Sequence, residues 1–241
     1  MKHWIKLFMY FVGSLLSSSS RSKVLYYHDV TPEKGDAHTD MSTPFDLFAS
    51  HMALVEQDGF RFVSKITQSK GEVMIAFDDG FHGVYDNKEF FRAHNICPTV
   101  FLATTLIGKE GYLNEAEIRE LQEQGFVFQC HTVSHTNLQK FSDEELKHEV
   151  EDSKRELEAL LGKDVDEICF PQGYFSDRVV EACRRAGYRK MYTSIPGDYD
   201  LKSDMVRRDL CQFESVKTFK MILHGGMNLL QNHYRKLHYL N

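Results

Sequence analysis

The chain has 241 residues, of which 42% are hydrophobic, and a formal net charge of −6 at pH 7. That length suits one α/β domain with a large core, and a pI of about 6.1 excludes the basic footprint of a nucleic-acid-binding domain. We therefore expect no nucleic acid partner. Five cysteines, odd in number and widely spaced, argue against a disulfide framework and against a Cys-x-x-Cys metal site.

Residues 1–20 differ from the rest, with an apolar run at 7–16 followed by four serines. The run is too short for a transmembrane helix, which needs about 20 apolar residues, and no cleavage site of the usual small-x-small type follows it. We expect an N-terminal helix that packs on the domain or makes peripheral membrane contact through residues 4–16, with a signal- or anchor-like segment as the alternative. Residues 21–241 then form a single domain. Unpaired cysteines favour a reducing compartment, so the expected location is cytoplasmic or peripheral at the inner membrane surface, with export as the alternative.

Strand-like and helix-like segments alternate from residue 21 onward. Runs of β-branched and aromatic residues predict strands near 23–30, 60–64, 73–77, 98–104, 126–130, 167–170, 188–194 and 205–210. Start signals, namely Thr43 before Pro44 and capping boxes at Asn114 and Ser142, predict helices near 44–58, 84–94, 115–124, 143–161, 176–186 and 215–234. About seven strand–helix repeats predict a parallel sheet with helices outside it, closed or nearly closed into a barrel.

Polar and ionisable side chains gather where these strands end. They are His28 and Asp29, Asp78 and Asp79, His131 and His135, and Gln172. In barrels of parallel strands the functional groups lie at the carboxyl ends of the strands. Four separate strands are therefore expected to bring these groups to one rim.

The adjacent carboxylates Asp78 and Asp79 need an explanation, because neighbouring like charges raise one pKa unless a cation lies close. A turn in which one aspartate caps the backbone and the other is solvated is one alternative. The segment from His131 to His135 favours a metal instead, since two imidazoles spaced i, i+4 and one carboxylate suit Zn²⁺ and leave a coordination position open. One aspartate then binds the metal while its neighbour accepts a proton from water, which is hydrolytic chemistry.

Three motifs, FDDG at 77–80, HTVSH at 131–135 and FPQGY at 170–174, resemble those of the polysaccharide deacetylase family, a NodB-homology group of the carbohydrate esterase family 4 type. The resemblance extends from about residue 26 to residue 209. It implies an α/β fold with a distorted, NodB-like (β/α) barrel of about seven strands. It also implies a metal-dependent hydrolase that removes N-acetyl groups from an amino sugar, either in a glycan or in a glycolipid or saccharide precursor.

The resemblance further implies roles for individual residues. Asp78 takes the place of the catalytic base. Asp79, His131 and His135 take the places of ligands to a divalent metal, with Zn²⁺ as the first expectation and Co²⁺ or another divalent ion as the second. Thr132 stands where the family has a hydroxyl group that hydrogen-bonds to support the histidine loop.

The chain departs from the family pattern at the arginine that orients the base, where it has Cys169. Arg207 or Arg208 from a later strand is the expected replacement, and an ordinary surface or edge-strand arginine is the alternative. Gln172 is expected to give a backbone N–H to the oxyanion, and Tyr174 to line the sugar site.

The general acid has two candidates. The family's late Leu-x-His motif has its nearest counterpart at His224, although the surrounding sequence predicts a helix that would leave this histidine on the surface. His28, at the end of the first strand, is the competing candidate. It could equally form a hydrogen-bonded pair with Asp29.

Two other functions stay open at this point. One is a metal-dependent amidohydrolase acting on a small amide such as a ureide or a cyclic imide. The other is a non-catalytic carbohydrate-binding relative, which the missing arginine would signal. Metal content separates the non-catalytic relative from both enzymes, and substrate size separates the two enzymes from each other.

Overall fold

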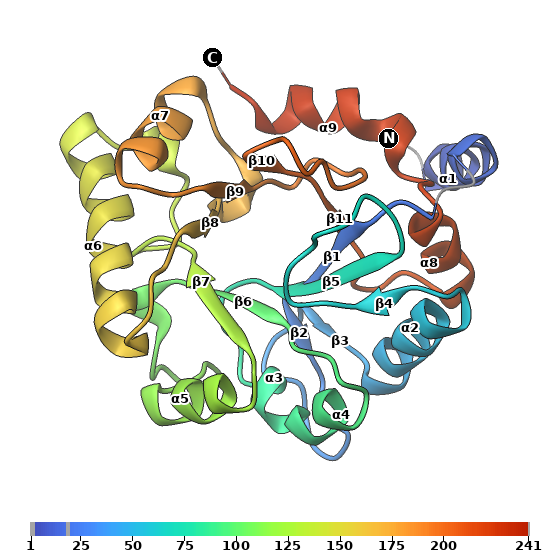
Figure 1. Ribbon diagram of the computed structural model, residues 1–241, viewed down its shortest axis with the longest axis horizontal. Coiled ribbons are helices and arrows are strands. Elements are labelled where there is room, and N and C mark those ends of the chain that lie inside the picture. The colour runs from blue at the N-terminus through green and yellow to red at the C-terminus, as the bar shows by residue number, and fades with distance from the viewer. Residues whose placement is uncertain (1–2, 18–19, 241) are drawn as a thin grey trace.

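The computed structural model describes residues 3–17 and 20–240. Parallel strands occupy the middle of the molecule, and helices surround them (Figure 1). The main sheet has the order β10-β9-β8-β7-β6-β5-β1-β11, with β4 also paired to β5, and every pairing in it is parallel. Its strands are β1 Lys23–Tyr27, β4 Arg61–Phe62, β5 Glu72–Phe77, β6 Thr99–Leu102, β7 Val127–Cys130, β8 Glu167–Cys169, β9 Lys190–Tyr192, β10 Met205–Val206 and β11 Arg208–Leu210.

The two ends of this sheet are contiguous in the chain. Only Arg207 separates β10 from β11, so a single stretch of chain pairs with β9 through Met205 and with β1 through Arg208. If β10 and β11 are counted as one strand, the described residues form a ring of seven strands. The other six are β9, β8, β7, β6, β5 and β1. The predicted α/β fold, a distorted (β/α) barrel of about seven strands, is therefore confirmed.

Alternate residues of each strand face opposite sides, as the pleat requires. Inside the ring, a cluster of buried side chains includes Val24, Met74 and Phe101. Outside it, a larger core that includes Leu25 and Ile75 fills the space between the strands and the helices. The carboxyl ends of the strands are thus held at fixed positions by packing on both faces.

Local signals place most helix ends. The capping boxes at Asn114 and Ser142 form as predicted, and Gly162 ends its helix in the left-handed conformation with φ 63°. The helices are α1 His3–Ser17, α2 Phe45–Gln57, α3 Gly83–Asp86, α4 Lys88–Ala93, α5 Glu115–Glu123, α6 Asp143–Leu161, α7 Asp177–Arg185, α8 Val216–Leu223 and α9 Gln231–His238.

Several predicted elements differ from the structure. The helix expected at 84–94 is divided at Asn87 into α3 and α4. The strand expected at 23–30 ends at Tyr27, and β2 Asp29–Val30 leaves the barrel to pair with β3 Ser42–Thr43. Pro44, not Thr43, is the N-cap of α2, because Thr43 belongs to β3. The helix expected at 215–234 is broken by two glycines into α8, a short 3-10 turn η4 Asn228–Leu230 and α9. These breaks follow from tertiary pairing, which local propensity does not report.

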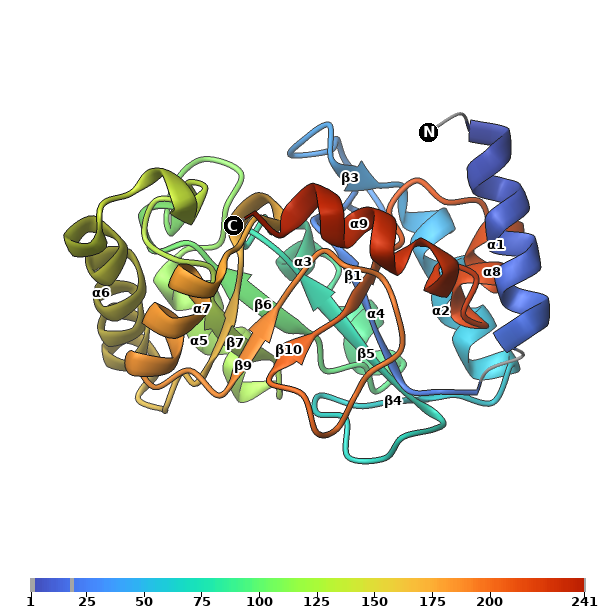
Figure 2. The same ribbon diagram turned by 90° about the horizontal axis from the view of Figure 1, so that it is seen from above.

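The N-terminal helix α1 packs on α8 and η4 (Figure 2). Tyr10 is fully buried in this contact, and Gly13 lies so close to Gly226 that a Cβ on it would be 2.6 Å from the Gly226 carbonyl oxygen. The opposite face of α1 exposes large apolar side chains, namely Trp4, Phe8, Phe11, Leu15 and Leu16. Among the described residues, no helix is both long and apolar enough to cross a bilayer.

Candidate active site

A cavity of about 340 Å³ opens at the carboxyl ends of the strands. Most of the predicted site residues line it, from β1, β5, β7, β8 and β11 or from the segments that follow them. They are His28, Asp78, Asp79, His131, His135, Gln172 and Arg208. The cavity therefore unites groups that are far apart in the sequence, as the barrel topology predicts.

Three potential metal ligands converge at this cavity. The Nε2 atoms of His131 and His135 lie 3.3 Å and 2.9 Å from Oδ1 of Asp79, and the three atoms fall within 4.8 Å of one another. Burial alone would raise the pKa of Asp79, but the two imidazoles lower it well below its ordinary value. The carboxylate is therefore ionised and available as a ligand.

Proton positions around these atoms also fit a cation. Nδ1 of His131 lies 2.8 Å from the Cys169 carbonyl oxygen, which can only accept, so Nδ1 carries the hydrogen and Nε2 of the neutral ring has a lone pair. That lone pair lies against Oδ1 of Asp79, a buried oxygen without a hydrogen-bond partner among the described residues. A divalent cation between the three atoms would satisfy all of them, so the residues fit the metal that the sequence predicts.

The backbone at the site adopts conformations that are uncommon for side-chain-bearing residues. Asp79, Thr132, His135 and Gln172 all have positive φ, between 57° and 72°. Such conformations persist only where the surroundings enforce them, and they cluster at functional sites. Gly80 has φ 78°, a left-handed conformation that favours glycine, and a Cβ there would also displace the Leu102 methyl carbon 2.5 Å away.

Asp78 is held by a buried arginine from β11. Nη1 and Nη2 of Arg208 donate to its two oxygens at 2.6 Å and 2.9 Å, while Nε donates to the carbonyl oxygen of Thr193 at 3.0 Å. The guanidinium also lies 4.0 Å from the centroid of the Tyr26 ring. Burial would raise the pKa of Asp78, but Arg208 lowers it overall. Cys169 lies beside this pair, with its Sγ 3.0 Å from Nη2, and Arg207 lies outside the cavity.

The loop that carries His135 is supported differently from what the resemblance implies. Thr132 Oγ1 is buried and has no hydrogen-bond partner among the described residues, so this hydroxyl does not support the loop. Glu149 of α6 accepts hydrogen bonds from the backbone N–H groups of Val133 and Ser134, both at 3.0 Å. The long helix therefore positions the loop that carries His135.

Two predicted residues lie outside the cavity. His224 ends α8 and pairs with Asp58, with 2.7 Å between Nε2 and Oδ2. It cannot act on a group bound beside Asp78, because the fold places it on the outer side of the barrel wall. Tyr174 is half-buried and does not line the cavity, and its ring centroid lies 5.5 Å from that of His238.

His238 is an ionisable residue of the cavity that the sequence did not indicate. It ends α9, lines the cavity, and has a buried Nδ1 without a hydrogen-bond partner among the described residues. Burial lowers its pKa. The only sequence signal was the histidine- and tyrosine-rich run HYRKLHY at 233–239, which has no spacing that links it to the other motifs.

Residues 65–191, just over half of the chain, match the family model described as polysaccharide deacetylase. The chain belongs to the polysaccharide deacetylase family. The matched segment contains Asp78, Asp79, His131 and His135.

Individual relatives agree with this membership. The chain is 24% identical to YxkH of Bacillus subtilis over 185 residues, which cover 72% of this chain and 64% of that protein. It is 28% identical to the chitooligosaccharide deacetylase of Azorhizobium caulinodans over 141 residues, which cover 57% of this chain and 65% of that protein. The chain thus spans just under two thirds of the length of each of these relatives.

A solved structure shares the fold. The Streptococcus pyogenes deacetylase PplD in complex with acetate matches with a TM-score of 0.74 at 21% identity, covering 84% of this chain and 98% of that chain. The likeness shows that this chain has the same fold.

Proposed function

We propose that this chain is a metal-dependent hydrolase that removes N-acetyl groups from an amino sugar, in a glycan or in a glycolipid or saccharide precursor. One observation carries the proposal: Asp79, His131 and His135 converge on one point of a cavity, directly beside an aspartate that a buried arginine keeps ionised. This is the arrangement that amide hydrolysis needs, a cation site with a neighbouring proton acceptor.

Asp79, His131 and His135 would hold the metal. Two imidazoles and a carboxylate suit Zn²⁺ first, with Co²⁺ as a second choice. When bound, such an ion lowers the pKa of a coordinated water toward about 7 and polarises the substrate carbonyl. The cavity supplies three protein ligands and room for the substrate, which is typical of catalytic rather than structural sites.

Asp78 acts as the base. Its carboxylate is ionised because Arg208 lowers its pKa, and the bidentate contact fixes its plane. Each carboxylate oxygen keeps a further lone pair, so Asp78 can accept the proton of the attacking water. The backbone N–H of Gln172, in the left-handed turn after β8, donates to the oxyanion.

His28 protonates the departing amine. Its Nδ1 lies 2.6 Å from Oε1 of Gln212, which orients the ring, and His28 lines the cavity together with Asp78. His238 is the other free histidine of the cavity, but burial lowers its pKa and so disfavours the charged form that a proton donor needs.

The size of the cavity supports a saccharide substrate taken one residue at a time. Its volume of about 340 Å³ is at the lower end of the range for small-molecule sites, enough for one sugar ring with its acetamido group. A relative named chitooligosaccharide deacetylase supports the same substrate class.

Acetate release from a panel of N-acetylhexosamine mono- and oligosaccharides tests the proposal. Metal-stripped protein should be inactive and should regain activity with Zn²⁺ or Co²⁺. Asp78→Asn should abolish turnover while the metal content is unchanged, and His28→Gln should lower kcat. His224→Gln, outside the cavity, is the matched control and should leave activity unchanged. Metal loss from Asp78→Asn would reverse the roles of the two aspartates, and no metal binding by the wild type would end the proposal.

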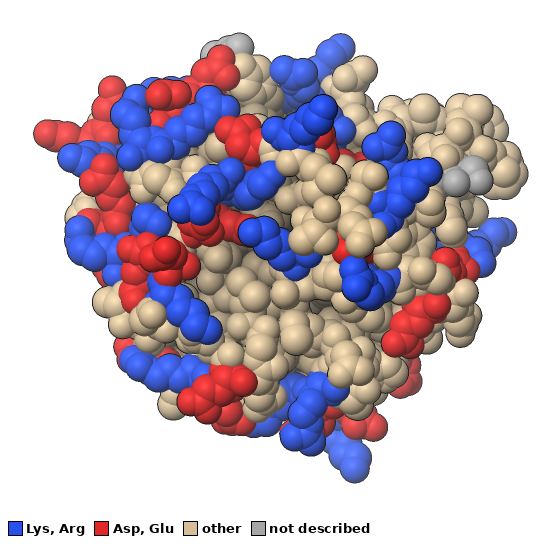
Figure 3. Space-filling model, in the orientation of Figure 1, with Lys and Arg blue, Asp and Glu red and all other residues tan. Residues whose placement is uncertain are grey.

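We also propose that the enzyme works at the inner membrane surface, with α1 as its contact. The apolar side chains of residues 4–16 that face away from α8 form one stripe, and at the upper right edge of Figure 3, where α1 lies, most of the described side chains in view are uncharged. Unpaired cysteines at all five positions support the cytoplasmic side. The full chain should co-sediment with phospholipid vesicles, and the variant Phe8→Ser/Leu15→Ser should not. Equal sedimentation of both proteins would refute the contact.

A further inference from the structure

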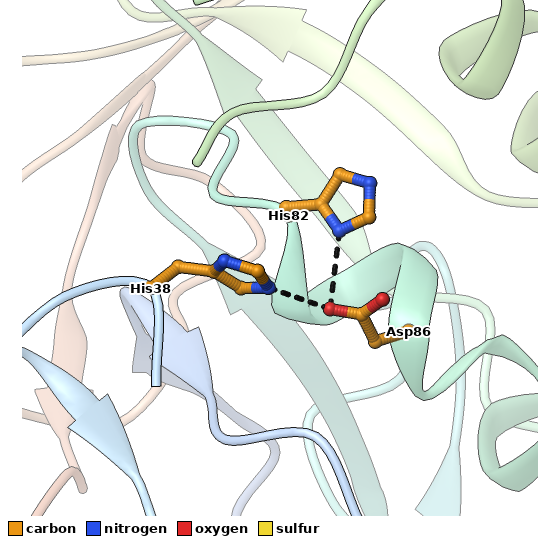
Figure 4. A group of neighbouring side chains, drawn as sticks. All are labelled: His38, His82 and Asp86. Carbon is orange, nitrogen blue, oxygen red and sulfur yellow. Dashed lines mark hydrogen bonds and ion pairs between the residues drawn. The ribbon is translucent and has the colours of Figure 1, made fainter. Parts of the chain in front are cut away.

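A second group of potential metal ligands lies outside the cavity (Figure 4). It consists of His38, in the loop between β2 and β3, His82, directly before α3, and Asp86 of α3. Nε2 of His38 lies 2.7 Å from Oδ2 of Asp86, and Nδ1 of His82 lies 3.1 Å from the same oxygen. Two imidazoles from separate segments therefore point at one carboxylate oxygen.

The other nitrogen of His82 has a partner of its own. Its Nε2 lies 3.1 Å from Oε1 of Glu117, and Glu117 is fixed by the capping box of α5, where its Oε2 accepts from the N–H of Asn114 at 2.9 Å. A metal-binding histidine characteristically donates its second N–H to a carboxylate in this way, which sets the tautomer and the ring orientation. Glu117 thus prepares Nδ1 of His82 to be a ligand.

This arrangement leaves a neutral His82 unable to satisfy both acids. A neutral imidazole has one N–H, so if it donates to Glu117, its Nδ1 lone pair faces the ionised Asp86. Asp86 and Glu117 thus bring one carboxylate to each ring nitrogen of His82, and Asp86 also faces Nε2 of His38. A divalent cation between Nε2 of His38, Nδ1 of His82 and the carboxylate of Asp86 would take the place of the hydrogens between these atoms, while Glu117 still accepts the N–H on Nε2 of His82.

We propose that His38, His82 and Asp86 form a second divalent-cation site, separate from the catalytic centre, with Glu117 as the residue that orients His82. The donor set is the imidazole–carboxylate type that suits Zn²⁺, with water completing the coordination. Tetrahedral Zn²⁺ sites hold ligand atoms about 3.3 Å apart. The ligand atoms here lie within 4.8 Å of one another, and the side chains are partly exposed, so small rotations suffice.

The site joins the cavity rim to the barrel. His38 belongs to the loop 31–41, whose last residue, Met41, lines the catalytic cavity, while the backbone N–H of His82 donates to the carbonyl oxygen of Gly111 at 2.9 Å. A bound cation would fasten the 31–41 loop to α3 and to the segment before α5. Its role is structural, because the ligands lie outside the catalytic cavity.

The chain offers a matched control on α6. His148 and Asp152 have the same i, i+4 spacing, and Nδ1 of the histidine also faces Oδ2 of the aspartate. Here Arg155 already pairs with Asp152, and these residues belong to none of the ligand groups found in the described part of the chain. His148→Ala therefore removes a similar ion pair without removing a proposed cation site.

The test is a Zn²⁺ titration of the metal-stripped full chain in competition with a chromophoric chelator, repeated with Co²⁺ to record the ligand-field spectrum. We expect two ions per chain for the wild type and for His148→Ala. His38→Ala should bind one ion, Asp79→Asn/His135→Ala should bind one, and the combined variant should bind none. Glu117→Gln should weaken the second site about 10- to 100-fold. Circular dichroism checks that each variant is folded.

The outcomes separate this inference from the proposed function. If the wild type binds one ion, which His38→Ala keeps and Asp79→Asn/His135→Ala loses, the second site does not exist and the catalytic centre stands. If Asp79→Asn/His135→Ala keeps one ion that is lost only when His38→Ala is added, the second site is established by itself. Equal affinity in Glu117→Gln and wild type would overturn the orienting role of Glu117.

Discussion

Replacing Arg208 by Met tests the central electrostatic contact of the site. The substitution keeps a long apolar side chain between Tyr26 and Phe101, whose rings lie 4.0 Å and 5.6 Å from the guanidinium carbon, but it removes the cation from Asp78. Asp78 is only 4% exposed, so water cannot replace the lost partner. The variant therefore contains a buried carboxylate without its counter-ion.

The expected cost is large. Removing one partner of a buried ion pair typically costs about 3–5 kcal/mol, and the loss of the two hydrogen bonds to Asp78, at about 1.5–3 kcal/mol each, gives an overlapping range of about 3–6 kcal/mol. For a domain of this size each kcal/mol shifts Tm by about 2–4 °C, so Tm should fall by about 6–20 °C. The double variant Asp78→Asn/Arg208→Met should recover about 2 kcal/mol or more, because no unpaired charge remains.

Urea unfolding of the four proteins in this cycle measures these values. The pH dependence supplies an independent check. In the wild type Arg208 holds the pKa of Asp78 below its ordinary value, so the contribution of Asp78 to stability is present above the unfolded pKa of about 3.9 and is lost as the pH falls through the folded pKa. In Arg208→Met the penalty comes from the charged carboxylate, so it should shrink as the pH falls from 7 toward 4. A loss below about 1 kcal/mol, or additive effects in the cycle, would refute the argument.

Three further predictions concern other parts of the chain. Gly83→Ala should lower the free energy of unfolding by about 3 kcal/mol, because its Cβ would overlap the Val30 carbonyl oxygen. Gly108 has open space around it and a left-handed backbone, so Gly108→Ala should lower the free energy of unfolding by only about 1–2 kcal/mol. Glu149→Gln should weaken Zn²⁺ binding at the catalytic centre about tenfold, since it loosens the loop before His135, and equal chelator-competition curves for variant and wild type would contradict this. Ellman's reagent at pH 8 should label the half-buried Cys97 fastest, because burial raises the pKa of the other four thiols. Denatured protein should give five reactive thiols. A second fast-reacting thiol in the native protein would contradict the burial of the other four.

The sequence predicted those features whose cause is local. The capping boxes at Asn114 and Ser142 depend on residues a few positions apart, and the structure contains both. His131 and His135 do converge, but not on the helical turn that their i, i+4 spacing suggests, because the segment is not helical and Glu149 of α6 holds it. Pairing between strands is not local. β2 is separate from β1 because it pairs with β3, and no residue in the run 23–30 indicates that pairing.

The choice between two adjacent arginines shows the same limit. A strand alternates its faces, so either Arg207 or Arg208 could have pointed inward. The register that pairs Arg208 with Val24 of β1 decides that Arg208, not Arg207, points inward. Register is a property of two strands far apart in the sequence, and the sequence of 205–210 alone leaves both phases open.

The general acid could not be chosen from the sequence for a related reason. His224 was selected by a motif, but two glycines after it end α8 and turn the chain back over the barrel. That reversal carries α9 and His238 to the cavity instead. The direction of the chain after Gly226 depends on its close contact with Gly13, over 200 residues earlier.

The contact between α1 and α8 also orders events during synthesis. The first helix leaves the ribosome about 200 residues before its partner exists, and at 5–20 residues per second the delay is about 10–40 s. The same interval precedes closure of the ring, since the stretch 205–210 that joins β9 to β1 is also late. Throughout that time α1 has an unpaired apolar surface on both of its faces. A nascent chain of this protein can therefore reach a bilayer or a chaperone through α1 before it can complete its own barrel.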